Sequence, residues 1–193
     1  MKKGKIILVL LSISIFINTF VSVSIAENNI AFADLGSQDK YTGIANVKME
    51  NDAVVSVVER GNSRGWLLSA NAKAMYLDFA DDFLSNLDDG TEVSVDIEYF
   101  DQDDGHFVLL YDGLNSKREL SDLVIVENTN RWKTCSFTID DGYFGGRLDG
   151  HDMKISIKEA ETDNITSADV VIGKITVHKY PQNLHTAYCP LLN

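Results

Sequence analysis

The residues best suited to binding chemistry lie in one glycine-rich stretch, where Tyr143 and Phe144 are followed by Gly145, Gly146 and Arg147. An aromatic ring can cover the apolar side of a sugar, and an arginine can donate paired hydrogen bonds to hydroxyls or to a carboxylate. Glycines let the backbone approach a ligand closely. The stretch therefore predicts a sugar-binding loop, while the alternative is that Phe144, and less so Tyr143, plugs the core beneath it.

Two tryptophans are further aromatic candidates. Trp66 and Trp132 each begin an expected strand after a turn, a position that serves either a binding rim or the end of a core. The core is the better interpretation for both, and more so for Trp132. Trp66 nevertheless stays among the candidate ligand-binding residues.

The carboxylates do not predict a catalytic pair. Asp96 and Glu98 share one face of an expected strand with Glu92, whereas glycoside hydrolysis needs two carboxyl groups that face a common groove. This pattern is typical of the solvated face of an outer strand. The four histidines are scattered, and no His-Glu-x-x-His or Gly-x-Ser-x-Gly motif occurs. We therefore expect no enzymatic activity.

Acidic clusters could hold calcium, which takes several carboxylate and carbonyl oxygens. They occur at Asp81–Asp82, Asp88–Asp89, Asp101 with Asp103 and Asp104, and Asp140–Asp141. None has the spacing of an EF-hand loop, and aspartates in turns most often bond nearby backbone amides. The metal ligands, if there are any, are thus unknown from the sequence.

The first residues have the layout of a secretory signal peptide. Lys2, Lys3 and Lys5 precede an apolar run over residues 6–17 and a short polar stretch that ends at Ala26. We expect cleavage after Ala26, with Ala33 as the other small-residue site. The product is expected to be secreted and to have no membrane span after cleavage.

The chain is strongly acidic, with a formal net charge of −12. Removing residues 1–26 takes away three lysines and no acidic residue, so the expected mature charge is −15. Such a surface repels phosphate backbones and anionic membranes, and no basic stripe is present. Nucleic acid is therefore excluded as a partner.

The main structural signal is a series of short alternating runs over residues 41–180, separated by Gly, Asn and Asp clusters. They predict strands at residues 53–59, 66–70, 74–78, 91–100, 106–111, 120–127, 133–139, 153–158 and 170–179. About nine strands with long connections favour an all-β, two-sheet sandwich. Residues 27–40 and 181–193 are interpreted as tails, and residues 80–87 as one short helical turn.

Two local features complete this prediction. Strands 91–100 and 106–111 are expected to pair as a hairpin, because the aspartate-rich turn between them is short. Cys135 alternates with Phe137 and Ile139, so its side chain is expected in the core, and a disulfide with Cys189 is the less favoured alternative.

Three runs resemble galactose-binding-like jelly-roll domains of the carbohydrate-binding-module type, which are attached to secreted bacterial glycosidases. They are residues 99–112, residues 128–134 with Trp opening a strand, and residues 143–155 with a Gly-x-Asp-x-x-Ile element. The resemblance implies a non-catalytic jelly roll, often with a structural calcium ion (Ca2+). His106 and Asp112, within the first run, are added to the candidate ligand residues.

These observations predict a secreted, monomeric, non-catalytic domain that binds a polysaccharide or other extracellular or cell-wall glycan around Tyr143 and Arg147. One alternative is a structural or adhesive β-sandwich that binds protein. A second is a jelly-roll polysaccharide-degrading enzyme, a lyase or a glycosidase.

Overall fold

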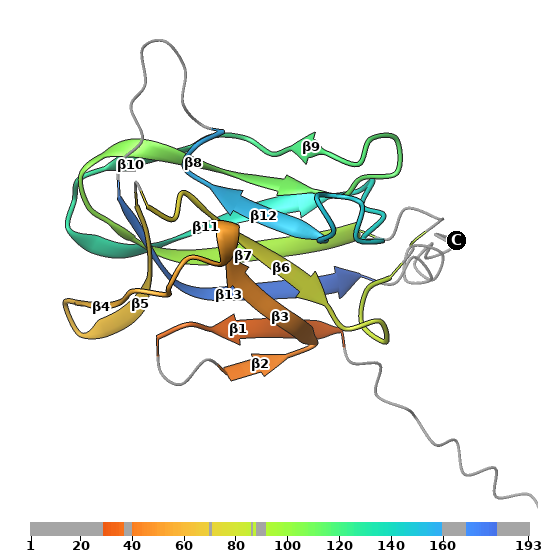
Figure 1. Ribbon diagram of the computed structural model, residues 1–193, viewed down its shortest axis with the longest axis horizontal. Coiled ribbons are helices and arrows are strands. Elements are labelled where there is room, and N and C mark those ends of the chain that lie inside the picture. Colours follow the sequence, from red (N-terminus) through yellow and green to blue (C-terminus); the bar gives the residue numbers. More distant parts are fainter. Residues whose placement is uncertain are drawn as a thin grey trace, which may run out of the picture.

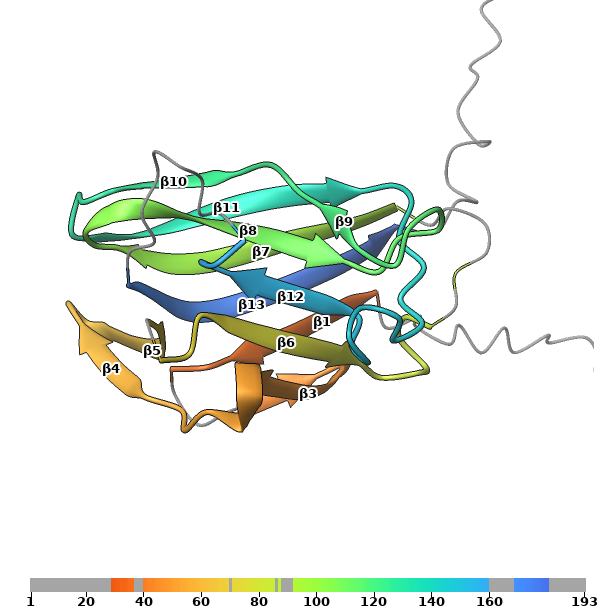
Figure 2. The same ribbon diagram turned by 45° about the horizontal axis from the view of Figure 1, so that its top comes forward.

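A computed structural model describes residues 29–36, 40–69, 71–85, 87, 92–159 and 169–180, and shows two packed β-sheets (Figures 1 and 2). The seven-stranded sheet has the order β11-β7-β13-β1-β2, with β5 paired to β13 and β4 paired to β5. Its strands are β1 (Ile30–Asp34), β2 (Lys40–Thr42), β4 (Val57–Arg60), β5 (Ser63–Leu68), β7 (Glu92–Asp101), β11 (Arg131–Ile139) and β13 (Val170–Tyr180).

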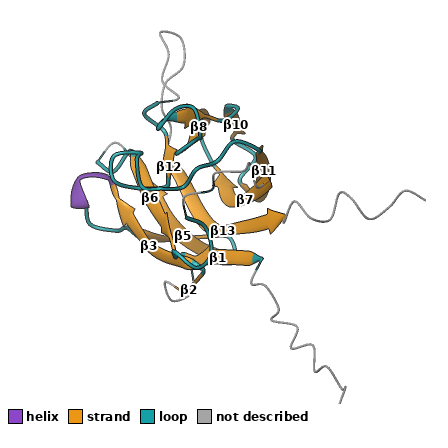
Figure 3. Cartoon of the chain, turned by 90° about the vertical axis from the view of Figure 1, so that its right-hand side faces the viewer, coloured by secondary structure: helices purple, strands orange, loops and turns teal. Residues whose placement is uncertain are grey.

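The second sheet has six strands in the order β10-β8-β12-β6-β3, with β9 paired to β8. Its strands are β3 (Ile44–Met49), β6 (Ala74–Phe79), β8 (Asp104–Tyr111), β9 (Glu119–Leu120), β10 (Val124–Glu127) and β12 (Met153–Ser156). Strands and loops make up nearly all of the described chain, and the single 3-10 helix, η1 (Glu50–Asp52), follows β3 (Figure 3). The predicted all-β, two-sheet sandwich is confirmed.

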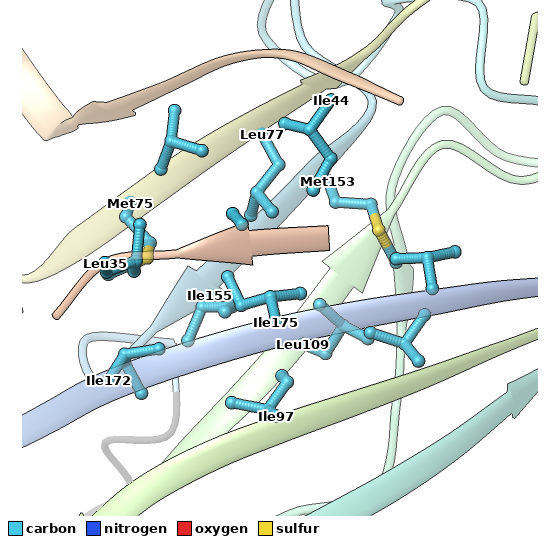
Figure 4. Packing of buried hydrophobic residues seen from close by; sticks show 14 of the residues in the cluster. Leu35, Ile44, Met75, Leu77, Ile97, Leu109, Met153, Ile155, Ile172 and Ile175 are labelled. Atoms are coloured by element: carbon cyan, nitrogen blue, oxygen red, sulfur yellow. The ribbon is translucent and has the colours of Figure 1, made fainter. Parts of the chain in front are cut away.

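Period-two alternation explains how the two sheets pack. On β7 the odd-numbered Val93, Val95 and Ile97 are fully buried, while the residues between them face outward and are half-buried. Figure 4 shows Ile97 and Ile175 of one sheet beside Leu109 and Ile155 of the other. Because fully burying a Leu or Ile side chain is worth about 1.5–3 kcal/mol, this interior holds the two layers together.

Each of the nine predicted strands overlaps an observed strand, with one division. The run over residues 120–127 forms two strands, β9 and β10. Between them, the Ser121 hydroxyl accepts the backbone N–H of Leu109 at 3.0 Å, and the Ser121 N–H donates to the Leu109 carbonyl. A side chain thus takes part in the ladder, which locally interrupts regular pairing.

The interpretation of residues 27–40 as a tail is corrected. Residues 30–34 form β1, which lies between β13 and β2, and Ala31 and Ala33 are fully buried. The strand escaped prediction because alanines carry its buried face and give only a weak alternation of hydrophobicity. The sandwich therefore begins near residue 30, and β2 and β3 are also additions to the predicted set.

The predicted hairpin is also corrected. β7 pairs with β11 and β13 in one sheet, whereas β8 pairs with β9, β10 and β12 in the other. The turn after Asp101 therefore carries the chain across the sandwich. Alternation shows that one face of each strand is buried, but it does not tell whether two successive strands lie side by side or face to face.

The expected helical turn over residues 80–87 is a single hydrogen-bonded turn. The N–H groups of Phe83 and Leu84 both donate to the Ala80 carbonyl, and both side chains are buried. No helix is assigned there among the described residues. Within the same part of the chain, no helix has the length and apolar composition needed to cross a bilayer.

Cys135 packs against the core, as predicted, and has a free thiol. Burial raises the pKa of this thiol to about 12, so it stays protonated at neutral pH. Cys189, the expected signal peptide and the tail over residues 181–193 lie outside the described residues.

Candidate functional site

The predicted sugar-binding loop follows β11 and bends sharply before β12. Phe144, Gly146, Asp149 and Gly150 all have positive φ, at 51°, 69°, 53° and 87°. Non-glycine residues rarely adopt this conformation, so surrounding contacts must hold the loop in place. Two buried carboxylates provide those contacts.

Asp112 is the main anchor of the loop, and its side chain is 0% exposed. One carboxylate oxygen accepts the backbone N–H groups of Gly145 and Arg147 at 2.9 and 3.0 Å. The other accepts Nε of Arg147 at 2.8 Å. Asp112 therefore holds the loop from within the protein, and no face of its side chain is open to a ligand.

Arg147 is largely engaged inside this arrangement. Besides the bond to Asp112, its Nη2 donates to the Gly113 carbonyl. Its guanidinium carbon lies 4.0 Å from the centroid of the Tyr143 ring, so it covers one face of that ring. A cation-π contact of this kind stabilises the loop. The two best predicted ligand contacts thus already bind one another, although the Arg147 side chain is still 38% exposed.

The other predicted ligand residues lie in different surroundings. Phe144 is 1% exposed and contacts Phe79 edge-on, and Trp66 is 3% exposed in the core, so neither ring presents a surface to a ligand. His106 lies on β8 opposite Ile125, and its buried Nδ1 has no hydrogen-bond partner. The structure therefore brings together Asp112, Tyr143, Phe144 and Arg147, but not Trp66 or His106.

Asp152 is the second anchor of the loop. Its carboxylate accepts the backbone N–H groups of Phe79 and Gly146 at 2.8 and 2.9 Å. Burial raises the pKa of this carboxyl group, and the nearby carboxylates of Asp78 and Asp112 add to that effect. Beside it, Nδ1 of His151 lies 2.7 Å from Asp78. Sequence reasoning noted Asp152 only as part of the Gly-x-Asp-x-x-Ile element, and it missed the contact of His151 with Asp78 because only the fold brings these two residues together.

Metal binding was considered for these acidic groups. In the described ranges, no three His, Cys, Asp or Glu side chains come together in a way that could hold a metal ion. Calcium binding by this chain therefore stays a prediction.

A second surface is more open. We call it the polar face, meaning the outward side of β7, β11, β13 and β1 in the seven-stranded sheet. The registers place side chains of these strands in rows across it. The rows are Thr134, Glu98, Lys174 and Asp34; then Ser136, Asp96, Thr176 and Phe32; then Thr138, Ser94, His178 and Ile30.

Asp96 occupies the middle of the polar face. It accepts the Ser136 hydroxyl at 2.6 Å, and its other oxygen lies 3.7 Å from Nε2 of His178. The His178 ring stacks on Tyr180 with centroids 6.5 Å apart, and Tyr180 is exposed. Carboxylate, hydroxyl, imidazole and phenol groups therefore converge on one half-exposed patch.

Aromatic rings also flank this patch on other sides. Phe32 lies between two lysines, with the ammonium groups of Lys40 and Lys174 at 5.9 and 5.5 Å from its centroid. Near the end of β7 at Asp101, the Trp132 ring contacts the Phe100 ring edge-on, with centroids 5.5 Å apart. The polar face thus combines ring surfaces with hydrogen-bonding groups.

The position of Trp132 corrects one prediction. A core position was the favoured interpretation for both tryptophans, and it is confirmed only for Trp66. Trp132 is half-buried outside the main core, and its indole N–H donates to the Arg60 carbonyl at 2.9 Å. A β-carbon at Gly173 would come within 2.7 Å of the indole, so glycine is what makes room for the ring.

The sequence did predict that Glu92, Asp96 and Glu98 face outward, and they do. It missed the site because their neighbours come from β11 and β13, 36 to 88 residues further along the chain. The alternating Thr and Ser of β11 and the Thr176 and His178 of β13 were a usable signal once strand order was known.

Comparisons with known proteins give matches in structure alone. No protein-family model matches the sequence, and no curated protein matches it. Three similar solved structures are described next, with the share of each chain covered.

The C-terminal family 6 carbohydrate-binding module of LamC, a laminarinase from Zobellia galactanivorans, is 12% identical over 78% of this chain and 100% of that one, with a TM-score of 0.43. A family 29 carbohydrate-binding module is 10% identical over 84% and 98%, with a TM-score of 0.45. A family 11 module from Clostridium thermocellum, in complex with a mixed-linked tetrasaccharide, is 13% identical over 77% and 95%, with a TM-score of 0.38. All three are carbohydrate-binding modules, the class that the sequence resembles, and the likeness itself does not tell what this chain binds.

Proposed function

We propose that this domain binds a glycan chain along the polar face. The observation that carries the proposal is the group around Asp96, where a carboxylate, a hydroxyl, an imidazole and an exposed phenol share one open patch. Sugars present apolar ring faces and many hydroxyls, and proteins bind them with aromatic rings and a few convergent polar groups. The polar face offers both kinds of group over the length of β7, which is roughly 30 Å for ten residues.

The charge of this face favours a neutral glycan. Glu92, Asp96 and Glu98 project from one strand, whereas Lys174 is the basic residue opposite Glu98. Carboxylates accept hydrogen bonds from hydroxyls strongly, and they repel uronate and sulfate groups. A neutral polysaccharide therefore fits the face better than an acidic one.

The loop around Tyr143 is less suited to binding a glycan than the polar face is. Most of the hydrogen-bonding capacity of Arg147 is directed to Asp112 and Gly113, and its guanidinium group occupies one face of the Tyr143 ring. A sugar would have to displace these contacts or use the remaining exposed edge. The loop is therefore the second candidate location for the same function.

A binding role without catalysis is part of the proposal. Asp96 and Glu98 lie on the same face of the same strand, and Asp96 is already bonded to Ser136. An arrangement in which two carboxyl groups face each other across a groove would be needed for hydrolysis. The polar face is instead suited to holding a chain.

Replacing Asp96 by alanine is expected to weaken glycan binding at least about tenfold, because hydrogen bonds to a charged group are worth about 1.5–3 kcal/mol. Affinity electrophoresis and calorimetry with neutral polysaccharides, with and without calcium, measure this loss. Asp104→Ala is the matched control, since Asp104 is exposed at the start of β8 in the other sheet.

Two results would count against the proposal. The first is that the wild-type protein is retained by none of the polysaccharides. The second is that Asp96→Ala binds as well as the control. If Tyr143→Ala abolishes binding while Asp96→Ala does not, the glycan site lies in the loop and the polar face is excluded.

Secretion is proposed together with this function, and β1 bears on where the signal peptide is removed. Ala31 and Ala33 are fully buried, and β1 pairs with both β13 and β2. A mature chain that began after Ala33 would lack this strand. We expect the exported protein to begin at Glu27, as intact mass measurement or N-terminal sequencing would show, and a start at Asp34 would contradict this.

A further inference from the structure

A groove of about 670 Å³ follows the open side of the sandwich, where the edge strand of each sheet lies. Residues 135–139 of β11 form one wall, and residues 120–124 with Tyr111 form the other. Side chains alternate between the two faces of a strand, so five consecutive residues can line one groove only along the edge of the strand. The groove therefore opens onto strand backbone.

The pairing register determines which backbone groups of β11 face this groove. Lys179 donates its N–H to the carbonyl of Asn29, so odd-numbered residues in this part of β13 bond toward β1. In an antiparallel ladder the backbone hydrogen bonds of successive residues point to opposite sides of the strand. Even-numbered residues of β13 therefore bond to even-numbered residues of β7. The odd-numbered residues of β7 then bond to odd-numbered residues of β11. The N–H groups of Thr134, Ser136 and Thr138 therefore point toward the groove.

Apolar side chains gather along the opposite wall. The described residues include seven exposed large hydrophobic side chains, and two of them, Leu120 and Leu123, line the groove. Exposed apolar groups that cluster in this way mark interaction surfaces more often than scattered ones do. The groove thus offers both unpaired backbone and apolar contact area.

Charge identifies the kind of partner. Asp122 lines the groove, and Glu119 and Asp140 flank it at one end. In the described part of the chain none of these three carboxylates forms an ion pair with Lys or Arg. A second copy of a chain with a net charge of −12 is disfavoured here, while a basic segment is attracted.

We propose that an extended basic peptide segment of a partner protein binds in this groove as an added strand beside β11. Its backbone pairs with the edge of β11, its apolar side chains contact Leu120 and Leu123, and its basic side chains meet Asp122 and Asp140. This is recognition by strand addition, in which main-chain hydrogen bonds provide affinity and side-chain contacts provide specificity.

The test uses the purified protein and a synthetic peptide of about eight residues that alternates lysine with valine and threonine. Thr138→Pro removes an N–H that β7 does not use, and proline is tolerated on edge strands, so the fold is expected to persist. Thr138→Ala keeps that N–H and serves as the matched control. We expect Thr138→Pro to bind the peptide at least about tenfold more weakly than wild type, and Thr138→Ala to bind it as wild type does.

A modified peptide and one further protein variant separate strand addition from simple charge attraction. A peptide with N-methyl groups on alternate residues keeps its charge but cannot pair as a strand, so its binding should be lost. Leu123→Ser should weaken binding without a change in the unfolding midpoint that exceeds that of Thr138→Ala.

Specific results would overturn the proposal. They are equal binding of the methylated and unmethylated peptides, equal binding by Thr138→Pro and Thr138→Ala, or a dimer of wild-type protein in sedimentation that Thr138→Pro abolishes. The titrations contain no sugar, so their outcome is independent of the proposed glycan site.

Discussion

Replacing Asp112 by alanine is expected to lower the free energy of unfolding by about 3–5 kcal/mol, because it removes three hydrogen bonds to a buried carboxylate, and bonds to charged groups are worth about 1.5–3 kcal/mol each. The substitution leaves the N–H groups of Gly145 and Arg147 without an acceptor, and it leaves the Arg147 guanidinium without its carboxylate. Urea unfolding followed by tryptophan fluorescence measures the loss.

The control for this experiment is Asp140→Ala, which removes an exposed aspartate from the same end of the sandwich. It should change stability by no more than about 0.5 kcal/mol. Arg147→Ala and the double variant complete a cycle that isolates the coupling of the pair. A loss below about 1 kcal/mol for Asp112→Ala would mean that the loop does not depend on this carboxylate.

Asp101 is expected to make the protein sensitive to acid. Burial by itself would raise the pKa of its carboxyl group, but hydrogen bonds from Lys133, from Thr129 and from the backbone N–H groups of Glu127 and Thr129 lower the pKa to about 2. The folded state therefore binds this proton more weakly than the unfolded state does. The carboxylate then contributes about 2 kcal/mol of stability, which is fully present above about pH 5 and is lost as the pH falls toward 2.

Asp101→Asn should remove that contribution. We expect the wild-type protein to be more stable than this variant by about 2 kcal/mol at pH 7, and the difference to shrink to about half near pH 3. The difference between the two proteins is the proper measure, because Asp152 titrates with the opposite sign: its raised pKa means that the folded state binds that proton more tightly. A difference that stays constant from pH 7 to pH 3 would contradict the assignment.

The sequence predicted the positions of strands far better than their partners. The alternation of Val93, Val95 and Ile97 with polar residues marks a half-buried strand wherever it lies. The same alternation does not show that β7 and β8 belong to different sheets, because side-chain period is a local property and pairing is not. β1 was missed because Ala31 and Ala33 contribute little hydrophobic contrast.

The candidate site was predicted only in part. Tyr143 and Arg147 do lie together, but sequence reasoning did not predict that the carboxylate of Asp112, 35 residues before Arg147, would bind the guanidinium group. The polar face depends on rows of side chains from β7, β11 and β13, which no local window contains. Trp132 was interpreted as a core residue because the resembled fold carries a buried tryptophan there, and no local pattern shows that its ring lies against Gly173 of β13.

The place of β13 has a consequence for the order in which the domain folds. This strand touches β7, β1 and β5, and it is the last strand of the described chain to be synthesised (Figure 1). Until residue 180 has been made, β7 and β1 have nothing to bridge them, so the seven-stranded layer stays in separate pieces. Because such distant pairings form slowly, we expect the seven-stranded layer to close only after the whole domain has left the ribosome.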